Sequence, residues 1–240
     1  MTTLVGSRIL AALAEVRDPE LDEPITTLGF VASASISPDG TAEVHLRLPT
    51  YFCAPNFAYL MVADAYDAVS ALGEVRTAAV VLDDHFASDA INEGVAARAG
   101  FARSFAGEAA GELDQLRAAF LRKAVLAGTD LVCRPLGLPP AELAAAVLGD
   151  LPPSEALDRL RRRRRELGLP AGDGAPLLID PGTGAPIGAD AVPLHLRAAR
   201  LTRTSLDANT GICRGMLRHR YDTDGEGEAP SGPAHHPRAG

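Results

Sequence analysis

A strand, a loop, a helix and a second strand follow one another over residues 41–82, and this order constrains the fold most. Apolar and polar residues alternate over 41–48, which predicts a half-buried strand that Pro49 ends. Apolar residues at helical spacing over 57–72 predict a helix, and the apolar run over 75–82 predicts a strand covered on both faces. Such crossovers are right-handed and join parallel strands, so we expect both strands to end at the same edge of a sheet.

An earlier strand should complete this sheet. Residues 30–36 alternate with period two, and the turn residues 37–40 predict antiparallel pairing with the strand that follows. A first helix should end near Arg17, and the acidic, proline-containing stretch 18–29 is too irregular for either period. We therefore predict a domain over residues 1–105 of α+β or α/β class, with a small three-stranded mixed sheet and helices.

The predicted topology brings three distant segments to one edge of the sheet. They are the acidic loop 18–29, the loop that holds Cys53, and the stretch after the third strand that contains Asp84 and His85. Cys53 precedes a helix start at which Pro55 suits the first turn, and a helix N-terminus favours the thiolate. The nearby carboxylates oppose that effect. A free cysteine is more often a small core residue, so packing is the alternative explanation for Cys53.

The second half of the chain changes character. Turn-rich and proline-rich stretches separate Ala/Leu/Arg-rich segments, which predicts a mainly helical domain over 106–221 and a disordered Gly/Pro-rich tail over 222–240. The predicted helices cover 113–124, 141–148, 154–167 and 192–201, with a short hairpin over 177–187.

Five consecutive arginines lie within one of these helices, at 161–165. The formal net charge of the 240-residue chain is −8, so we interpret this run as a solvated helix face or a docking patch for an acidic partner. The same balance argues against nucleic acid as a partner. No stretch approaches the ~20 apolar residues of a membrane helix, and the N-terminus lacks the pattern of a signal peptide, so we expect a cytoplasmic protein without a membrane partner.

The chain has three cysteines and no CxxC pair, which argues against a disulfide framework and against a self-contained zinc site. Cys133 follows apolar residues and is expected in the core. Cys213 lies in the small-residue stretch 205–215 beside Arg214, a setting that can stabilise a thiolate. Cys53 and Cys213 could form one soft-metal site if the two halves of the chain fold against each other.

Several motifs together resemble a known family. They are Asp18-Pro19-Glu20, then Leu28-Gly29-Phe30-Val31, and then the loop from Thr50 through Cys53 to Pro55. This set is similar to the SufT/PaaD-like iron–sulfur cluster assembly domain over about residues 7–105. Three positions depart from the family pattern: Thr27 replaces the usual Asp, Ala54 separates Cys53 from Pro55, and His85-Phe86 stands where the family is often Trp-centred.

The resemblance implies a small α/β domain and a role in maturing iron–sulfur or related iron proteins. It implies that Cys53 is a transient ligand of iron or a cluster. From the sequence itself, we add Cys213, His85 and Asp84 as candidate further ligands. Relatives accompany multicomponent oxygenases, so the implied partner is a client metalloprotein, for which a diiron monooxygenase component is a candidate. One thiol is too few for a stable cluster, so a second cysteine or a second subunit, as in a homodimer, must contribute.

Two other functions compete with this assembly factor. One is a protein-binding chaperone or accessory subunit of an oxygenase that uses no metal. The other is a thiol enzyme with Cys53 as nucleophile, His45 or His85 as base and Asp84 orienting His85. The sequence lacks a nucleophile elbow and an oxyanion glycine loop, which favours an assembly factor over a catalyst.

Overall fold

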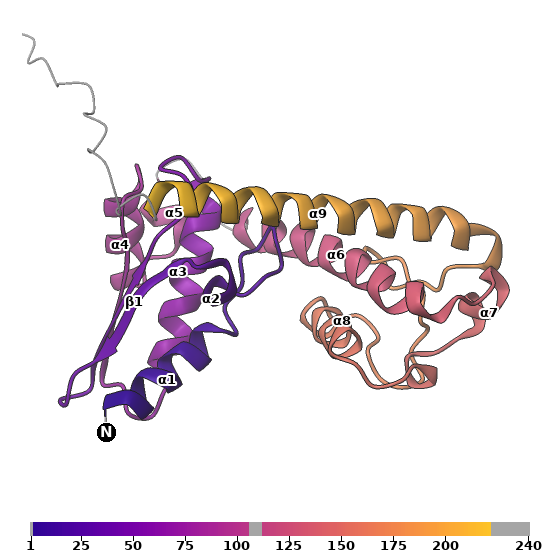
Figure 1. Cartoon of the computed structure of the whole chain (residues 1–240), viewed down its shortest axis with the longest axis horizontal. Helices are drawn as coiled ribbons and strands as arrows, with labels where there is room; N and C mark the ends of the chain where they lie inside the picture. The colour runs from indigo at the N-terminus through magenta and orange to yellow at the C-terminus, as the bar shows by residue number, and fades with distance from the viewer. Residues whose placement is uncertain (1, 106–111, 222–240) are drawn as a thin grey trace, which may run out of the picture.

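A computed structural model describes residues 2–105 and 112–221. The described chain forms two lobes side by side along its longest axis (Figure 1). We call the part from α1 to α5 the sheet lobe and the part from α6 to α9 the helical lobe. None of the helices in these two ranges is long and apolar enough to cross a membrane. The tail predicted to be disordered lies outside the described residues.

The sheet lobe contains the predicted three-stranded mixed sheet. Strands β1 (Val31–Ile36), β2 (Thr41–Leu46) and β3 (Thr77–Leu82) lie in that order. β1 pairs with β2 antiparallel, and β2 pairs with β3 parallel. Helix α3 (Pro55–Ser70) connects the parallel pair, so the crossover predicted from the sequence is confirmed.

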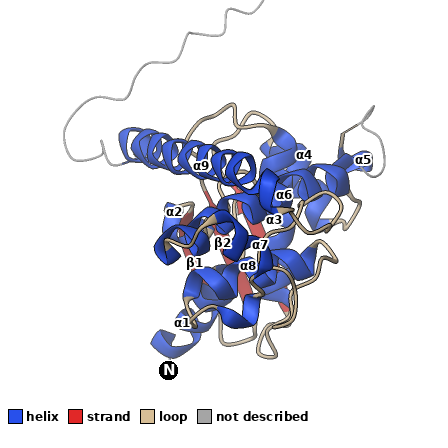
Figure 2. Ribbon diagram, turned by 90° about the vertical axis from the view of Figure 1, so that its right-hand side faces the viewer, coloured by secondary structure: helices blue, strands red, loops and turns tan. Residues whose placement is uncertain are grey.

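One face of the sheet forms the core of this lobe. Ala42, Val44 and Leu46 of β2 are fully buried, and α1 (Thr2–Leu13) and α3 contact the strands on that side (Figure 2). The prediction that β3 is covered on both faces is wrong, because Thr77 and Ala79 are exposed. β3 is an edge strand of a sheet with a single crossover helix, so its apolar residues gain cover on one side.

Two predictions about the approach to β1 need correction. The first helix ends at Leu13 and not near Arg17, and the stretch 18–29 contains a one-turn helix, α2 (Ile25–Leu28). Gly29 ends α2 in the left-handed region, with φ of 80°. Amphipathic periodicity cannot show a helix this short, because it contains barely more than one turn.

β1 is also less regular than its alternating pattern predicts. Its register against β2 shifts between Val31 and Ser33. This irregularity turns Ala32 outward, whereas Ala34 and Ile36 still pack against the core.

Two short helices, α4 (Ser88–Ala96) and α5 (Phe101–Ser104), complete the sheet lobe. The helical lobe contains α6 (Glu112–Cys133), α7 (Pro140–Ala145), α8 (Glu155–Glu166) and α9 (Val192–Tyr221). The predicted hairpin is reduced to one isolated bridge between Ile179 and Pro186. The lobe has its own apolar core, which includes Leu143, Leu160 and Leu177.

Helix α9 is 30 residues long, three times the length expected for it. It lies along α6 and reaches back over the sheet lobe (Figure 1). The prediction of a turn-rich stretch over 205–215 is therefore wrong. Serine, asparagine and glycine there disfavour a helix, but packing against α6 and burial of Leu217 in the sheet-lobe core overcome their low propensity.

The structure also corrects the prediction for the arginine run of α8. These side chains contact other residues of the same chain. Arg163 is 6% exposed and Arg164 is fully buried. Arg163 pairs with Asp22 of the sheet lobe at 2.6 Å, while Arg164 donates to the carbonyls of Pro176 at 2.8 Å and Leu177 at 2.5 Å. The prediction that the run forms a solvated face or a docking patch for a partner is thus wrong for these two residues.

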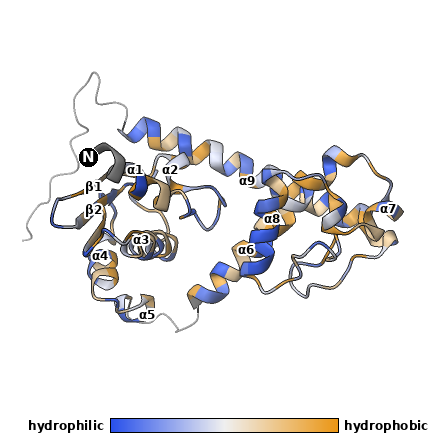
Figure 3. Ribbon diagram, turned by 90° about the horizontal axis from the view of Figure 1, so that it is seen from below, coloured by the Kyte–Doolittle hydropathy of each residue, from blue (hydrophilic) through white to orange (hydrophobic). Residues whose placement is uncertain are grey.

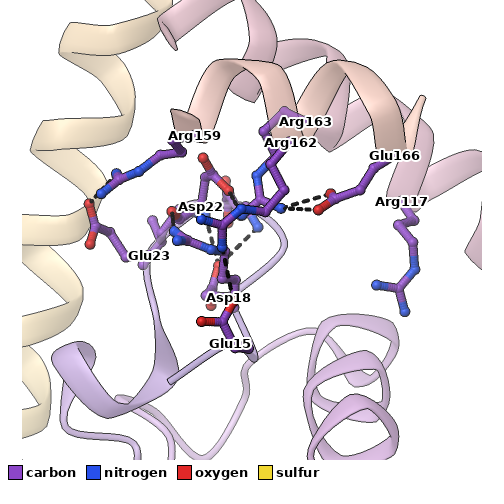
Figure 4. Close-up of polar contacts among 12 residues, drawn as sticks. Glu15, Asp18, Asp22, Glu23, Arg117, Arg159, Arg162, Arg163 and Glu166 are labelled. Carbon is purple, nitrogen blue, oxygen red and sulfur yellow. Dashed lines mark hydrogen bonds and ion pairs between the residues drawn. The ribbon is translucent and has the colours of Figure 1, made fainter. Parts of the chain in front are cut away.

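Helix α8 lies on the side of the helical lobe that faces the sheet lobe, and it is strongly hydrophilic (Figure 3). Arg159 pairs with Glu23 at 3.6 Å and Arg162 with Glu15 at 2.9 Å, which adds two contacts to the acidic segment of the sheet lobe (Figure 4). This helix therefore joins the two lobes through ion pairs.

Candidate functional site

Cys53 lies on the loop between β2 and α3, as the topology predicts. Ala54 is the N-cap of α3 and Pro55 occupies its first turn, so the thiol immediately precedes a helix N-terminus. The side chain is half-buried, and its sulfur is hydrogen-bonded to Thr50 Oγ1 at 3.3 Å.

His85 connects the segment after β3 to this loop. Its Nε2 lies 2.8 Å from the carbonyl oxygen of Cys53, and its Nδ1 accepts from the Ala87 amide at 3.2 Å. This pattern corresponds to the neutral imidazole that donates from Nε2. His85 is 3% exposed, and burial lowers its pKa. Both ring nitrogens are engaged by backbone, so His85 holds the Cys53 loop in place and would have to release a contact to bind metal.

Asp84 joins the same edge of the sheet to the end of α9. Its carboxylate is paired with Arg220 and accepts from the Tyr221 hydroxyl at 3.3 Å. Arg220 also donates to the carbonyls of Leu48 at 3.1 Å and Asp84 at 2.7 Å. One guanidinium thus binds the chain just beyond both parallel strands, and this anchors α9 over the site.

Cys213 lies on α9 two turns before Arg220. It packs against the same apolar core as Cys53, so the last described helix brings a second thiol to the predicted edge. Burial, together with negative charge on Asp18, Cys53 and Glu20, raises the pKa of Cys213 to about 11. The predicted meeting of the two halves of the chain therefore places Cys213 within electrostatic reach of Cys53.

Asp18, the first residue of the Asp-Pro-Glu motif, is 8% exposed. Its Oδ1 accepts from the amides of Glu20 at 2.9 Å and Leu21 at 2.8 Å. Burial nevertheless raises the pKa of Asp18 to about 6, because desolvation outweighs the two hydrogen bonds. The acidic loop thus lies within electrostatic reach of Cys213, and the pKa of one of its carboxyls is about 6.

Packing explains why the second motif has a glycine at position 29. Its φ is 80°, and a Cβ at this position would lie 3.1 Å from Leu217 Cδ2 of α9. Only glycine satisfies both the left-handed backbone and the close approach of the helix. The motif therefore helps to seat the helix that bears Cys213.

The donor set at the site is incomplete. In the part of the chain that the structure describes, no group of three or more His, Cys, Asp or Glu side chains is arranged to hold a metal ion. The thiols of Cys53 and Cys213 are soft ligands that suit iron or a cluster, but two ligands leave coordination positions open. Asp84 and His85 lie beside the loop with their polar atoms engaged.

A cluster of exposed aromatic side chains beside Cys53 was not expected from the sequence. Tyr51, Phe52 and Phe86 are 43%, 76% and 49% exposed. Their ring centroids lie 5.0 to 6.3 Å apart, and the Phe86 amide donates to the Tyr51 carbonyl at 3.1 Å. Only 5% of the residues are aromatic, yet three of them lie close in sequence to Cys53 and His85. This local enrichment could have predicted the cluster.

The other candidate residues lie elsewhere. His45 bonds Asp83 through Nδ1 at 3.0 Å and Glu43 through Nε2 at 3.2 Å, and both contacts raise its pKa. Cys133 is 4% exposed in the helical-lobe core, where burial raises the pKa of its thiol to about 12. Cys133 is therefore an inert core thiol, as the sequence predicts.

Comparison with known proteins agrees with the motifs. Residues 7–80 match the family described as "Iron-sulfur cluster assembly protein". A solved structure of a domain of unknown function, DUF59, from Bacillus anthracis is 22% identical, covers 41% of this chain and 92% of its own, and superposes with a TM-score of 0.32. A search of curated proteins finds no match. The sequence similarity thus lies in the sheet lobe and supports the expected iron–sulfur assembly family there.

Proposed function

We propose that this protein acts in iron–sulfur cluster assembly and carries iron or a cluster, as cargo, between Cys53 and Cys213 before delivery to a client metalloprotein. The family match over residues 7–80 supports the general role. The approach of two thiols from segments far apart in the sequence is the observation that supports the ligand assignment. The family motifs support the site indirectly, since Asp18 borders it and Gly29 seats α9.

The chemistry of the pair suits a carrier. Each thiol must lose its proton to bind a soft metal, and the raised pKa of Cys213 makes that loss unfavourable at neutral pH. The cargo is therefore held less tightly than by two preformed thiolates. Two thiolates also leave positions at the metal that cysteines of a client can occupy. Incomplete ligation and a half-buried, protonated thiol both favour release over storage.

The exposed aromatic cluster of Tyr51, Phe52 and Phe86 supports docking of the client beside the cargo. Exposed aromatic side chains that pack on one another are typical of protein-binding surfaces. A diiron monooxygenase component remains a candidate client. The same cluster favours the second candidate function, a protein-binding chaperone without metal, so the two functions must be separated at the thiols.

Anaerobic titration with Co²⁺ tests the ligand assignment, because thiolate ligation of Co²⁺ gives charge-transfer absorption. We expect this absorption for the full reduced chain, and about half of it after Cys53→Ala or Cys213→Ala, since each variant removes one of two thiolates. Cys133→Ala is the matched control and should leave the absorption unchanged. Reconstitution with iron and sulfide should show the same dependence on the variants.

The pH dependence provides a second readout. A metal ion must displace the proton of the Cys213 thiol when it binds. Release of this one proton should raise the apparent affinity for the metal about tenfold for each pH unit between pH 6 and 8. The Cys213→Ala variant should lose this component. Absence of thiolate absorption in the unmodified chain, with client maturation retained in the Cys53→Ala/Cys213→Ala double variant, would reject the carrier and favour the chaperone.

A further inference from the structure

Three arginines line a pocket on the side of α9 that faces α2 and β2. The pocket has a volume of about 430 Å³, within the range of small-molecule sites. Its walls come from the end of α2, from the residue after β2 and from the last turns of α9. The lining residues are Thr27, Leu28, Gly29, Arg47, Arg214, Leu217 and Arg218.

The positive charge in this pocket is not compensated. In the described ranges, none of Arg47, Arg214 and Arg218 forms an ion pair, and no carboxylate lines the pocket. Other arginines near the lobe contact do form ion pairs: Arg163 of α8 pairs with Asp22, and Arg220 of α9 with Asp84. Three unpaired guanidinium groups around one pocket are notable in a chain with a formal net charge of −8.

The side chains are held in place but keep donors free. Arg47 donates through Nε to the Gly29 carbonyl at 3.4 Å, and its guanidinium lies over the Tyr221 ring at 4.8 Å. Arg218 donates through Nε to the Arg214 carbonyl at 3.4 Å. The Nε of Arg214 is buried and has no hydrogen-bond partner among the described residues. Each guanidinium group has five N–H donors, so donors remain for an anion in the pocket.

We propose that this pocket binds the phosphate group of a small molecule. Guanidinium groups match the geometry and charge of a phosphate through paired hydrogen bonds, and a dianion compensates more of the three positive charges than one carboxylate does. The Thr27 hydroxyl, which is exposed at the rim, can add a neutral donor. The volume exceeds that of a single phosphate, so the preferred ligand carries either a second phosphate or an organic part.

Isothermal titration calorimetry of the full chain at low ionic strength tests this site. The probes are inorganic phosphate, pyrophosphate and ADP, in a buffer free of other multivalent anions. Pyrophosphate and ADP should bind more tightly than phosphate because they engage more guanidinium donors. Arg214→Gln and Arg218→Gln should each weaken binding about tenfold or more, as expected when a charged hydrogen bond is lost. Binding of ADP well above pyrophosphate would assign the remaining volume to the organic part of the ligand.

Arg200→Gln is the matched control, because Arg200 is exposed on the same helix and does not line the pocket. It should leave the affinity nearly unchanged. Thr27→Asp adds a carboxylate to the pocket and should abolish binding of all three probes while the circular dichroism spectrum is retained. The proposal is overturned if no probe binds, if Arg200→Gln weakens binding as much as Arg214→Gln, or if a polyglutamate peptide binds more tightly than pyrophosphate.

Discussion

Asp18 is a carboxyl group whose charged form the fold disfavours. It is 8% exposed and desolvation raises its pKa to about 6, whereas an unfolded aspartate has a pKa of about 3.9. The folded state therefore binds the proton more tightly than the unfolded state between these two values. Stability should fall as pH rises through this window and stay reduced above it, by roughly 3 kcal/mol at most. A charge kept at such an unfavourable position beside Cys213 suggests a use at the site.

Asp18→Asn should remove this pH dependence. An amide oxygen can still accept from the Glu20 and Leu21 amides, but it carries no charge to desolvate. We expect the variant to be more stable than the parent at pH 7 by about 1 to 3 kcal/mol and equally stable near pH 4. Urea denaturation at pH values from 4 to 7.5 measures both.

Asp39→Asn is the control for the Asp18 prediction. Asp39 is exposed, and hydrogen bonds from Ser37 and Thr41 lower its pKa, so its contribution to stability is lost only as pH falls through values below the Asp18 window. A parent chain whose stability does not change between pH 4 and 6 would contradict the raised pKa of Asp18.

Helix α8 shows how an element can be predicted while its role is not. Its boundaries follow from local chemistry, because Ser154 caps the first turn by accepting from the Leu157 amide at 3.2 Å. The burial of Arg164 depends instead on carbonyls of Pro176 and Leu177, which only the folded chain brings close. A run of charges can thus be located from the sequence, but its surroundings cannot.

Replacing Arg164 should destabilise the helical lobe more than replacing its exposed neighbour Arg165. Arg164→Leu leaves two buried carbonyls without donors, at about 1 to 3 kcal/mol each, but it also removes a charge whose desolvation lowers the arginine pKa to about 10. We expect a net loss of about 2 kcal/mol for Arg164→Leu and under ~0.5 kcal/mol for Arg165→Leu. Chemical denaturation measures the difference, and equal losses would place Arg164 at the surface.

The sheet was predictable and α9 was not, for a physical reason. Alternating residues and a tight turn define β1 and β2 locally, and the handedness of crossovers then places Cys53 and His85 at one edge. The 205–215 part of α9 has poor helix propensity and is helical because it packs on α6 and reaches the sheet lobe. The approach of Cys213 to Cys53 depends on that packing. From the sequence, it could be predicted only on the condition that the two halves of the chain fold against each other.

At the scale of the whole molecule, two apolar cores share one helix. Leu217 of α9 is 5% exposed in the sheet-lobe core, whereas Val192, at the other end of α9, is buried in the helical-lobe core. Ion pairs between the lobes, such as Arg163 with Asp22 and Arg117 with Asp64, reinforce the connection. The two cores should therefore unfold together as one cooperative unit.

Leu217→Ala should weaken this coupling. Loss of a buried leucine costs about 2 to 5 kcal/mol, and here the loss falls on the contact between α9 and the sheet lobe. Differential scanning calorimetry should show one transition for the parent chain and two for Leu217→Ala. Leu143→Ala, in the helical-lobe core, is the control and should lower the midpoint without separating the lobes. Two transitions in the parent chain would show that the cores are independent.

The position of Cys213 in the chain has a consequence for biosynthesis. The sheet lobe emerges from the ribosome first, with Cys53 on its loop, while Leu217 and Cys213 are still to be added. A nascent chain that has not yet reached α9 therefore has Cys53 without Cys213, and its sheet-lobe core lacks Leu217. Cys213 can therefore reach the sheet-lobe core beside Cys53 only after translation has passed α9.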